Sequence, residues 1–311
     1  YLMMLSLLSA KKFYENVTLY TNKTQANFLK EMGFDYIFDT EILSDIDQDI
    51  WVIPKLLACK NQVEPFIHID IDTILTKNIN RKSDIYFAHH DITSKKITDI
   101  SIDKLSDFKR YWEIISFCKT YFASYFEYGV DKFIPIEEIK IDKIPNMSII
   151  GVNEYDLFSN AIEKTLDLYK IQKSQYDDGD LHTAVLLEQF SLPHFINQIK
   201  DIEFDFITEK DSFNLEDENQ HFDMDKYIRN LPYFHVGGKR RNEPIFRALI
   251  IKMIIEEFGL HYVNSIFNFY RNYLQKNDII NQPTIGELTY EKLSGQPLFT
   301  NMGYKNLEYL L

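Results

Sequence analysis

Residues 65–75 read PFIHIDIDTIL and carry the strongest strand signal in the chain. Isoleucine alternates with polar side chains in this segment, and a period of two is typical of a β-strand. The alternation predicts His68, Asp70 and Asp72 on one face and the isoleucines on the other. Two carboxylates about 7 Å apart at the end of a buried strand need a counter-charge. A divalent cation, alone or with a phosphate ligand, would supply it.

Strand and helix patterns alternate on both sides of this segment. The alternation predicts an α/β fold with a mixed, mainly parallel sheet flanked by helices. Strands are predicted at residues 17–21, 36–38, 65–75, 85–89, 147–152, 201–208 and 233–236. Helices are predicted at residues 2–13, 23–32, 50–61, 154–170 and 181–190, with two more from 243 to about 275 that break near Gly259. Open α/β sheets bind ligands beyond the carboxyl ends of their strands, which is where the acid pair would lie.

The order of these elements predicts the domain organisation. We expect one domain over residues 1–242 and a helical carboxyl-terminal appendage and tail over residues 243–311. The chain opens on a helical pattern, whereas α/β domains usually begin with a strand. We therefore expect that the first strand of the domain is missing at the amino terminus.

Composition excludes several classes of protein. The chain has 311 residues and a formal net charge of −13, which disfavours a phosphate backbone as the main ligand. Its 2 cysteines, Cys59 and Cys118, cannot form a disulfide framework or a cysteine zinc site. No apolar run reaches the roughly 18 to 20 residues of a membrane span. We expect no nucleic-acid partner, no transmembrane segment, and a cytoplasmic location that is at most peripheral to the inner face of a membrane.

A second cluster of functional residue types is YFHVGGKRRN, residues 233–242. A short aromatic strand leads to His235, two glycines allow the backbone to approach a ligand closely, and three cations follow. In an acidic chain this is the concentrated basic patch, and it would hold a diphosphate. The alternative is a surface turn of solvated cations.

The acid pair and the histidine-glycine turn together resemble the nucleotide-sugar glycosyltransferases of the GT-A fold. The similarity is greatest to bacterial enzymes related to the family 8 and capsular-polysaccharide glycosyltransferases. That family has a Trp-x-x-x-Lys helix before the acid strand, then an Asn-x-Gly-Ile-x-Gly strand, a helix ending in Glu-Gln and a His-Gly-Lys turn. The matching residues here are Trp51, Lys55, Pro65, Phe66, His68, Asp70 and Asp72, then Asn146 to Gly151, Glu188 and Gln189, and His235 to Lys239.

The resemblance implies a GT-A-like sheet and transfer of a sugar from a nucleotide-diphosphate donor to a hydroxyl of a glycan or lipid-linked acceptor. It implies that Asp70, Asp72 and His235 bind Mn²⁺ or Mg²⁺, which bridges the donor diphosphate. It implies catalytic roles for Glu188 and Gln189. The donor-binding residues that it implies are Lys55, Asp70, Asp72, Asn146, Gly151, Gly237, Gly238, Lys239 and Arg241.

Two positions depart from the family pattern. Ser148 replaces a favoured glycine, and Val152 follows Gly151 where a second glycine is common. The family 8 turn reads His-x-x-Gly-x-x-Lys, and this spacing places Arg241 at the position of the diphosphate-binding lysine. The shorter His-Gly-Lys turn places Lys239 there instead. The nucleobase, the sugar, the acceptor and the choice between retention and inversion stay open.

Each weaker candidate has a structural alternative. Lys55 is either a donor contact or a solvated lysine. Glu188 lies on an apolar helical face, so it either binds the substrate or forms a buried pair. Asn146 and Gly151 either shape a sugar pocket or make a tight strand turn. His68 is expected to be a core histidine.

Two other function classes fit parts of the sequence. DIDTI is close to the Asp-x-Asp-x-Thr/Val pattern of haloacid dehalogenase-type phosphatases, with Asp177, Asp178 and Asp180 as later metal acids. Ile74 occupies the Thr/Val position, however, and YFHVGGKRRN has no role in that chemistry. The other alternative is a non-catalytic carbohydrate- or protein-binding module on the same fold, which would bind its ligand without a metal.

Overall fold

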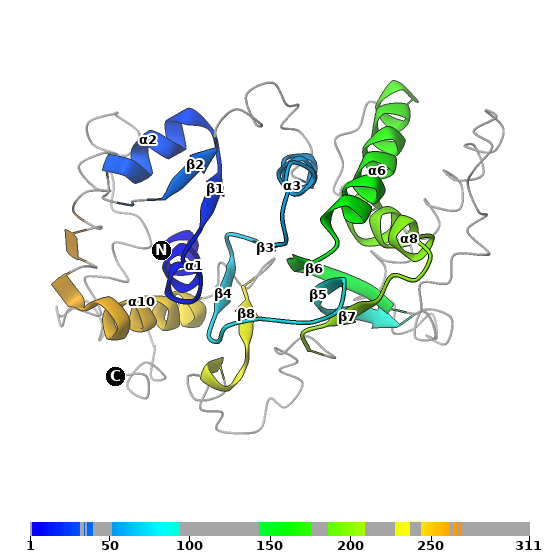
Figure 1. Ribbon diagram of the computed structural model, residues 1–311. Helices are drawn as coiled ribbons and strands as arrows, with labels where there is room; N and C mark the ends of the chain where they lie inside the picture. Colours follow the sequence, from blue (N-terminus) through cyan, green and yellow to red (C-terminus); the bar gives the residue numbers. More distant parts are fainter. Residues whose placement is uncertain are drawn as a thin grey trace, which may run out of the picture. The chain divides into compact units, whose positions relative to one another are not determined.

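The computed structural model describes residues 2–31, 34, 36–39, 52–93, 143–175, 186–208, 228–236, 244–261, 264–265 and 268, in a mixed α/β arrangement (Figure 1). The chain forms two compact units. Unit 1 comprises Tyr1–Phe38, Asp70–Asn78 and Asp217–Leu311, and unit 2 comprises Asp39–Ile69 and Ile79–Glu216. The predicted boundary between 242 and 243 falls among residues outside the described part, and it stays a prediction.

Unit 1 is built around a two-stranded antiparallel pair and the helix that packs on it. Its elements are α1 (Leu2–Phe13), β1 (Thr18–Tyr20), α2 (Lys23–Glu31), β2 (Ile37–Asp39), β4 (Thr73–Leu75), β8 (Tyr233–His235) and α10 (Pro244–Phe258). β4 pairs antiparallel with β8, and β1 pairs with β2. Helix α1 packs against both β4 and α10.

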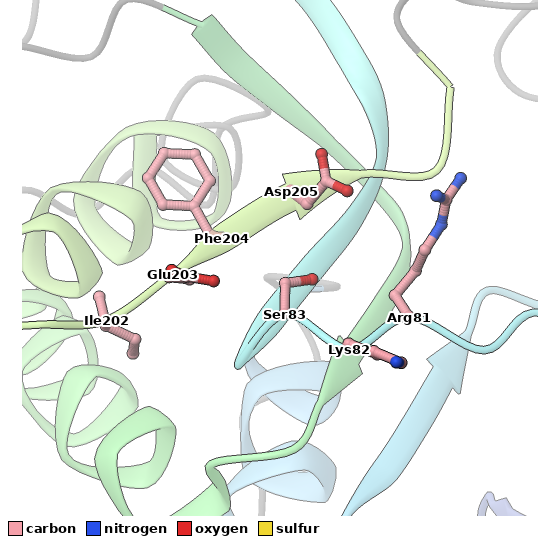
Figure 2. A pocket seen from close by; sticks show the side chains of 7 residues that line it. All are labelled: Arg81, Lys82, Ser83, Ile202, Glu203, Phe204 and Asp205. Atoms are coloured by element: carbon pink, nitrogen blue, oxygen red, sulfur yellow. The ribbon is translucent and has the colours of Figure 1, made fainter.

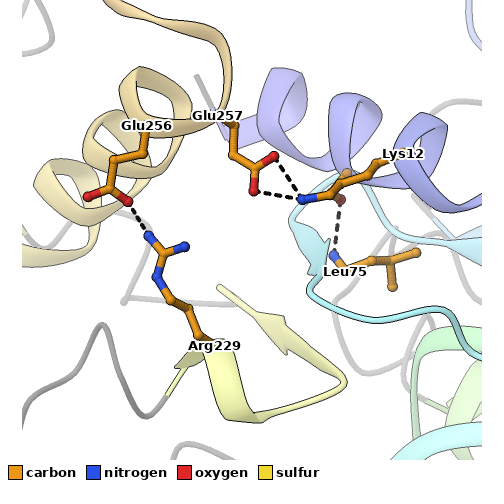
Figure 3. A network of polar contacts seen from close by, with 6 residues as sticks. Lys12, Leu75, Arg229, Glu256 and Glu257 are labelled. Carbon is orange, nitrogen blue, oxygen red and sulfur yellow. Dashed lines mark hydrogen bonds and ion pairs between the residues drawn. The ribbon is translucent and has the colours of Figure 1, made fainter.

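Polar contacts fix the position of α1 in this unit. The Ser9 hydroxyl accepts a 3.0 Å hydrogen bond from the Leu75 amide of β4. Lys12 pairs with Glu257 of α10 at 2.8 Å, and Arg229 pairs with the neighbouring Glu256 (Figure 3). Apolar residues of α1, β1 and α2 also pack together in one buried cluster, among them Met4, Leu7, Leu19 and Leu29.

Unit 2 holds the larger sheet. Its elements are α3 (Val52–Lys60), β3 (Phe66–Ile69), β5 (Ile85–Thr93), β6 (Lys143–Val152), α6 (Tyr155–Gln175), the π-helix η3 (Leu186–Ser191), α8 (Leu192–Asn197) and β7 (Phe204–Phe206). The strand order is β3-β6-β5-β7. Side chains from α3, α6, α8 and the sheet form one buried core, which includes Leu56, Phe87, Ile150, Phe158 and Phe195.

The described strand pairings differ from the predicted, mainly parallel sheet. Strands β3 and β5 both pair antiparallel with β6, whereas β5 and β7 pair parallel. Parallel pairing requires a long crossover, and alternation of helix and strand patterns does not reveal in which direction each strand runs. The mixed α/β class is confirmed, but the described pairings are more antiparallel than expected.

The predicted strand at residues 65–75 is two strands. β3 ends at Ile69 and β4 begins at Thr73, with a turn between them that the Thr73 amide closes by donating to the Asp70 carbonyl at 2.9 Å. The break predicted near Gly259 is confirmed, because α10 ends at Phe258 and Gly259 has a φ of 83°.

Other predictions meet the described residues only in part. The predicted helix at 181–190 is described from Leu186 onward, where it is a π-helix rather than an α-helix. Residues 99–128, where Phe and Tyr recur in a mixed helical pattern that the sequence also predicts, lie outside the described residues. Within the described part of the chain, no helix is both long enough and apolar enough to cross a membrane.

Candidate functional site

Asp72 and His235 lie side by side in unit 1. Strands β4 and β8 are antiparallel with Thr73 opposite His235, and the Val236 amide donates to the Asp72 carbonyl at 2.9 Å. This pairing brings His235 Nε2 to 3.4 Å from Asp72 Oδ1, with side-chain exposures of 21% and 9%. Two residues 163 positions apart in the sequence are therefore held together by backbone hydrogen bonds.

The turn that carries the acid pair differs from the predicted geometry. Alternation ends with β3, so Asp70 and Asp72 lie in a turn rather than on one face of a strand. Ile71 between them is 55% exposed, whereas Asp72 is buried. The Ser6 hydroxyl of α1 donates to the Asp70 carbonyl at 3.3 Å and helps to hold the turn.

Asp72 and His235 could supply two of the ligands of a divalent cation. Among the described residues, no group of three or more His, Cys, Asp or Glu side chains is arranged to hold a metal ion, and the role of Asp70 as a third ligand stays a prediction. Asp72 and His235 remain as a pair 3.4 Å apart. Neighbouring ligands of an octahedral Mg²⁺, with bonds of about 2.1 Å, lie about 3 Å apart. Mg²⁺ also commonly takes only one or two carboxylates and fills its shell with water and phosphate oxygens.

A second group of predicted residues meets inside unit 2. Lys55 of α3 and Glu188 of η3 form an ion pair with Nζ 2.6 Å from Oε1, and each side chain is only 6% exposed. Lys55 Nζ also donates to the Met147 carbonyl of β6. Of the two alternatives for Glu188, the structure shows the buried pair, and substrate binding stays a prediction; Lys55 is a buried lysine rather than a solvated one.

The backbone around this pair is irregular. Strand β6 shifts register against β5 between the pairs Phe87–Ile150 and His89–Asn146. Three residues of β6, 147–149, lie there opposite the single residue Ala88 of β5, which makes a bulge. The Asn146 side chain accepts a 3.0 Å bond from the Ser148 amide in this bulge, and the Ser148 hydroxyl is buried without a hydrogen-bond partner. Bulges and π-helices are both frequent at functional sites. The sequence shows Ser148 only as a departure from a glycine; no local signal marks the bulge.

Gly151 has a structural explanation. A Cβ at this position would lie 1.8 Å from the Tyr86 ring, which covers the glycine from the neighbouring strand. A side chain is excluded here by strand packing, which supports the structural alternative for Gly151.

The remaining predicted residues divide into two groups. Gln189 lies half-buried on η3 beside Glu188, and His68 lies half-buried on β3. The glycines and cations of the predicted diphosphate turn lie outside the described residues; they are Gly237, Gly238, Lys239 and Arg241.

Comparison with known proteins gives one match. The model of a family described as "Family of unknown function (DUF6734)" matches residues 1–269. No curated protein and no solved structure matched the chain.

Proposed function

We propose that this chain, which belongs to the family of unknown function DUF6734, is a metal-dependent glycosyltransferase. In this proposal it has a GT-A-like fold and transfers a sugar from a nucleotide-diphosphate donor to a glycan or lipid-linked acceptor hydroxyl. We further propose that it acts in the cytoplasm, free or at the inner face of the membrane.

The observation that carries the proposal is the approach of Asp72 to His235. The sequence marks the acid turn and the aromatic strand as separate candidates, and a ligand bound by both would explain why each carries a metal-binding residue type. Their side chains lie 3.4 Å apart and are neither fully exposed nor fully buried. A carboxylate beside an imidazole, followed in sequence by glycines and cations, suits a cation that carries a diphosphate.

Asp72 and His235 would hold Mn²⁺ or Mg²⁺, with Asp70 in the same turn. When bound, the cation would neutralise the charge that develops on the departing nucleotide diphosphate. Lys239 or Arg241 would bind the diphosphate through charge-assisted hydrogen bonds. Asp70, at the other end of the turn, would orient the metal ligands through its backbone bond to Thr73.

Glu188 and Gln189 would act on the sugar side of the reaction. The Lys55 ammonium holds Glu188 in one orientation and keeps a negative charge stable in a buried position. A carboxylate held in this way is positioned for hydrogen bonds to sugar hydroxyls, and Gln189 follows it on the same turn of η3.

The test is thermal stabilisation by UDP and by GDP, each with and without Mn²⁺. A ligand that binds only the native state adds roughly 3 kcal/mol at a hundredfold excess over its Kd. We expect a Mn²⁺-dependent shift with one nucleotide and its loss in Asp72→Asn and in His235→Ala. Glu31→Gln is the matched control, because Glu31 is an exposed carboxylate of the same unit. If neither nucleotide shifts the unfolding temperature, the proposed donor site is wrong.

Turnover separates this proposal from its alternatives. A glycosyltransferase releases the nucleotide diphosphate from the matching nucleotide sugar in a Mn²⁺-dependent manner. A phosphatase would release inorganic phosphate from 4-nitrophenyl phosphate, and a binding module would release neither product.

A further inference from the structure

Unit 2 contains a surface cavity of about 580 Å³ that includes none of the candidate site residues (Figure 2). One wall is the segment Arg81–Lys82–Ser83, which precedes β5. The other wall consists of Ile202 and the β7 residues with their neighbour, Glu203 to Asp205. Its volume lies within the roughly 300 to 1,000 Å³ of small-molecule sites.

Hydrogen bonds hold the first wall in one conformation. The Asn153 side-chain amide donates to the carbonyls of Arg81 at 3.0 Å and Ser83 at 2.7 Å. Arg81 itself donates to the Ile207 carbonyl at 2.7 Å. The loop is therefore fixed through its carbonyls and the Arg81 side chain, which leaves the Lys82 and Ser83 side chains available.

The second wall is fixed by the sheet. Strand β7 pairs parallel with β5, the Ile85 amide donates to the Glu203 carbonyl at 3.1 Å, and the Glu203 amide donates to Asp84 at 2.8 Å. The Phe204 ring contacts Phe87, with centroids 6.3 Å apart, yet remains 39% exposed. The position of this aromatic surface is thus set before any ligand arrives.

Within the described ranges, the cavity contains hydrogen-bond donors and acceptors that form no hydrogen bonds with one another. The Ser83 hydroxyl is buried and has no hydrogen-bond partner. In the described part of the chain, Lys82 forms no ion pair with Glu203 or Asp205, although all of them line the same cavity. Buried polar atoms normally have partners, so the Ser83 hydroxyl is a candidate to bond a ligand in the cavity.

We propose that this cavity is a binding site for a neutral sugar residue. The formal charges of its two cations and two carboxylates cancel, which disfavours a simple anion or cation. A sugar hydroxyl both donates and accepts hydrogen bonds, so a pyranose needs carboxylates and cationic or hydroxyl donors together. The exposed part of Phe204 and Ile202 offer apolar surface to the C–H face of the ring.

This site goes beyond the proposed donor chemistry and does not depend on it. The cavity lies at the Ile85 end of β5, whereas Asn146 pairs with His89, four residues farther along that strand. Four residues of a strand span about 13 Å. The two sites can therefore be tested separately, and sugar binding here needs neither nucleotide nor metal.

The experiment is ligand-observed saturation-transfer NMR on the full chain without nucleotide or Mn²⁺. The probes are D-glucose, D-galactose, D-mannose, N-acetyl-D-glucosamine and lactose, each titrated to about 50 mM. We expect at least one probe to bind in the millimolar range. Asp205→Asn and Ser83→Ala should each weaken it about fivefold to tenfold, since the first replaces a charged acceptor oxygen by an N–H donor and the second removes a hydroxyl.

Controls keep the result specific. Ser83→Ala removes a hydroxyl without a partner, so it should unfold at the same temperature as the wild type or higher. Lys200→Ala, an exposed cation outside the cavity, should leave sugar binding unchanged. The proposal is overturned if no probe binds, if both cavity variants bind as the wild type does, or if inorganic phosphate displaces the sugar. A Mn²⁺-dependent nucleotide shift that survives in Asp205→Asn would keep the proposed function intact whichever result is found.

Discussion

Loss of one partner from a buried ion pair is costly, because the other charge then remains in a medium of low dielectric. Lys55 and Glu188 are such a pair, at 2.6 Å and 6% exposure each. Glu188→Ala should therefore lower the free energy of unfolding by about 3 to 5 kcal/mol. The double variant Lys55→Met/Glu188→Leu, which removes both charges, should recover most of that loss. Urea denaturation of the wild type and both variants measures these differences.

The chain supplies a matched control on the same helix. Lys60 of α3 pairs with Glu163 at 2.8 Å, but these side chains are 33% and 52% exposed. Glu163→Ala should cost less than about 1 kcal/mol. Equal losses in Glu188→Ala and Glu163→Ala would show that the first pair is solvated.

His194 should make stability depend on pH. Burial, followed by the charge of Lys164, lowers the pKa of His194 from 6.5 to about 4. Gln198 Nε2 lies 2.9 Å from His194 Nε2, and a protonated ring could not accept a bond from the amide. Between pH 6.5 and pH 4 the unfolded chain binds this proton and the folded chain does not. The stability contributed by the neutral ring is thus present above pH 6.5 and decreases as the pH falls through this window.

Urea unfolding at pH 7 and at pH 4.5 measures the effect. The wild type should lose up to about 3 kcal/mol through this group. His194→Gln cannot titrate, so its loss over the same interval should be smaller by that amount. The comparison removes the contribution of the chain's many carboxylates, which both proteins share. Identical losses in the two proteins would mean that folding does not lower the pKa of His194.

The sequence shows the residue types of the Lys55–Glu188 pair, but it does not show that these two side chains meet. Glu188 was predicted to need a partner because an acid on an apolar face does. Lys55 lies 133 positions away, however, and no local pattern links the two. For Asp72 and His235, the sequence predicts a shared ligand because both are metal-binding residue types. In the structure, these two side chains lie next to each other.

At the scale of elements, periodicity located most segments and failed where a turn has no glycine or proline. The predicted strand at 65–75 continues its alternation through Asp70 and Asp72, yet the backbone turns there. Strand direction was missed for a related reason. Antiparallel pairing of β6 with both β3 and β5 depends on long-range packing, which local periodicity does not encode.

The pairing of β5 with β6 depends on Gly151. Its absent side chain makes room for the Tyr86 ring, which a Cβ would approach to 1.8 Å. Gly151→Ala should therefore destabilise the protein by about 3 kcal/mol, the upper end of the usual cost of overpacking, since ring and strand must both move. In a Tyr86→Ala background the same substitution should cost almost nothing. Thermal unfolding of the two single variants and the double variant measures this coupling.

Gly259→Ala is the comparison for that substitution. A Cβ at Gly259 would meet nothing within 4 Å, but the φ of 83° is unfavourable for alanine. A loss of about 1 kcal/mol is expected from the backbone alone. Two outcomes would show that the contact with the Tyr86 ring does not explain the glycine. In one, Gly151→Ala lowers the free energy of unfolding no more than Gly259→Ala does. In the other, Gly151→Ala is equally destabilising in the Tyr86→Ala background.

At the scale of the whole molecule, the chain passes four times between its two units, since unit 1 has three segments and unit 2 has two. Local patterns cannot reveal this arrangement, because each segment alone looks like part of one continuous α/β chain. It places the proposed metal ligands Asp72 and His235 in unit 1 and the Lys55–Glu188 pair in unit 2. Binding of a cation alone should therefore stabilise unit 1 and leave unit 2 unchanged.

Mn²⁺ added without nucleotide should slow amide hydrogen exchange in unit 1, around residues 70–76 and 233–236, because a bound cation stabilises β4 and β8 against local opening. Strand β6 and helix α6 of unit 2 should exchange as before. With a net charge of −13, the chain also attracts cations without specificity, but that attraction would act on acidic surfaces of both units. Asp72→Asn should abolish the regional protection while leaving any general effect. Protection that is uniform, or that persists in Asp72→Asn, would exclude these residues as the cation site.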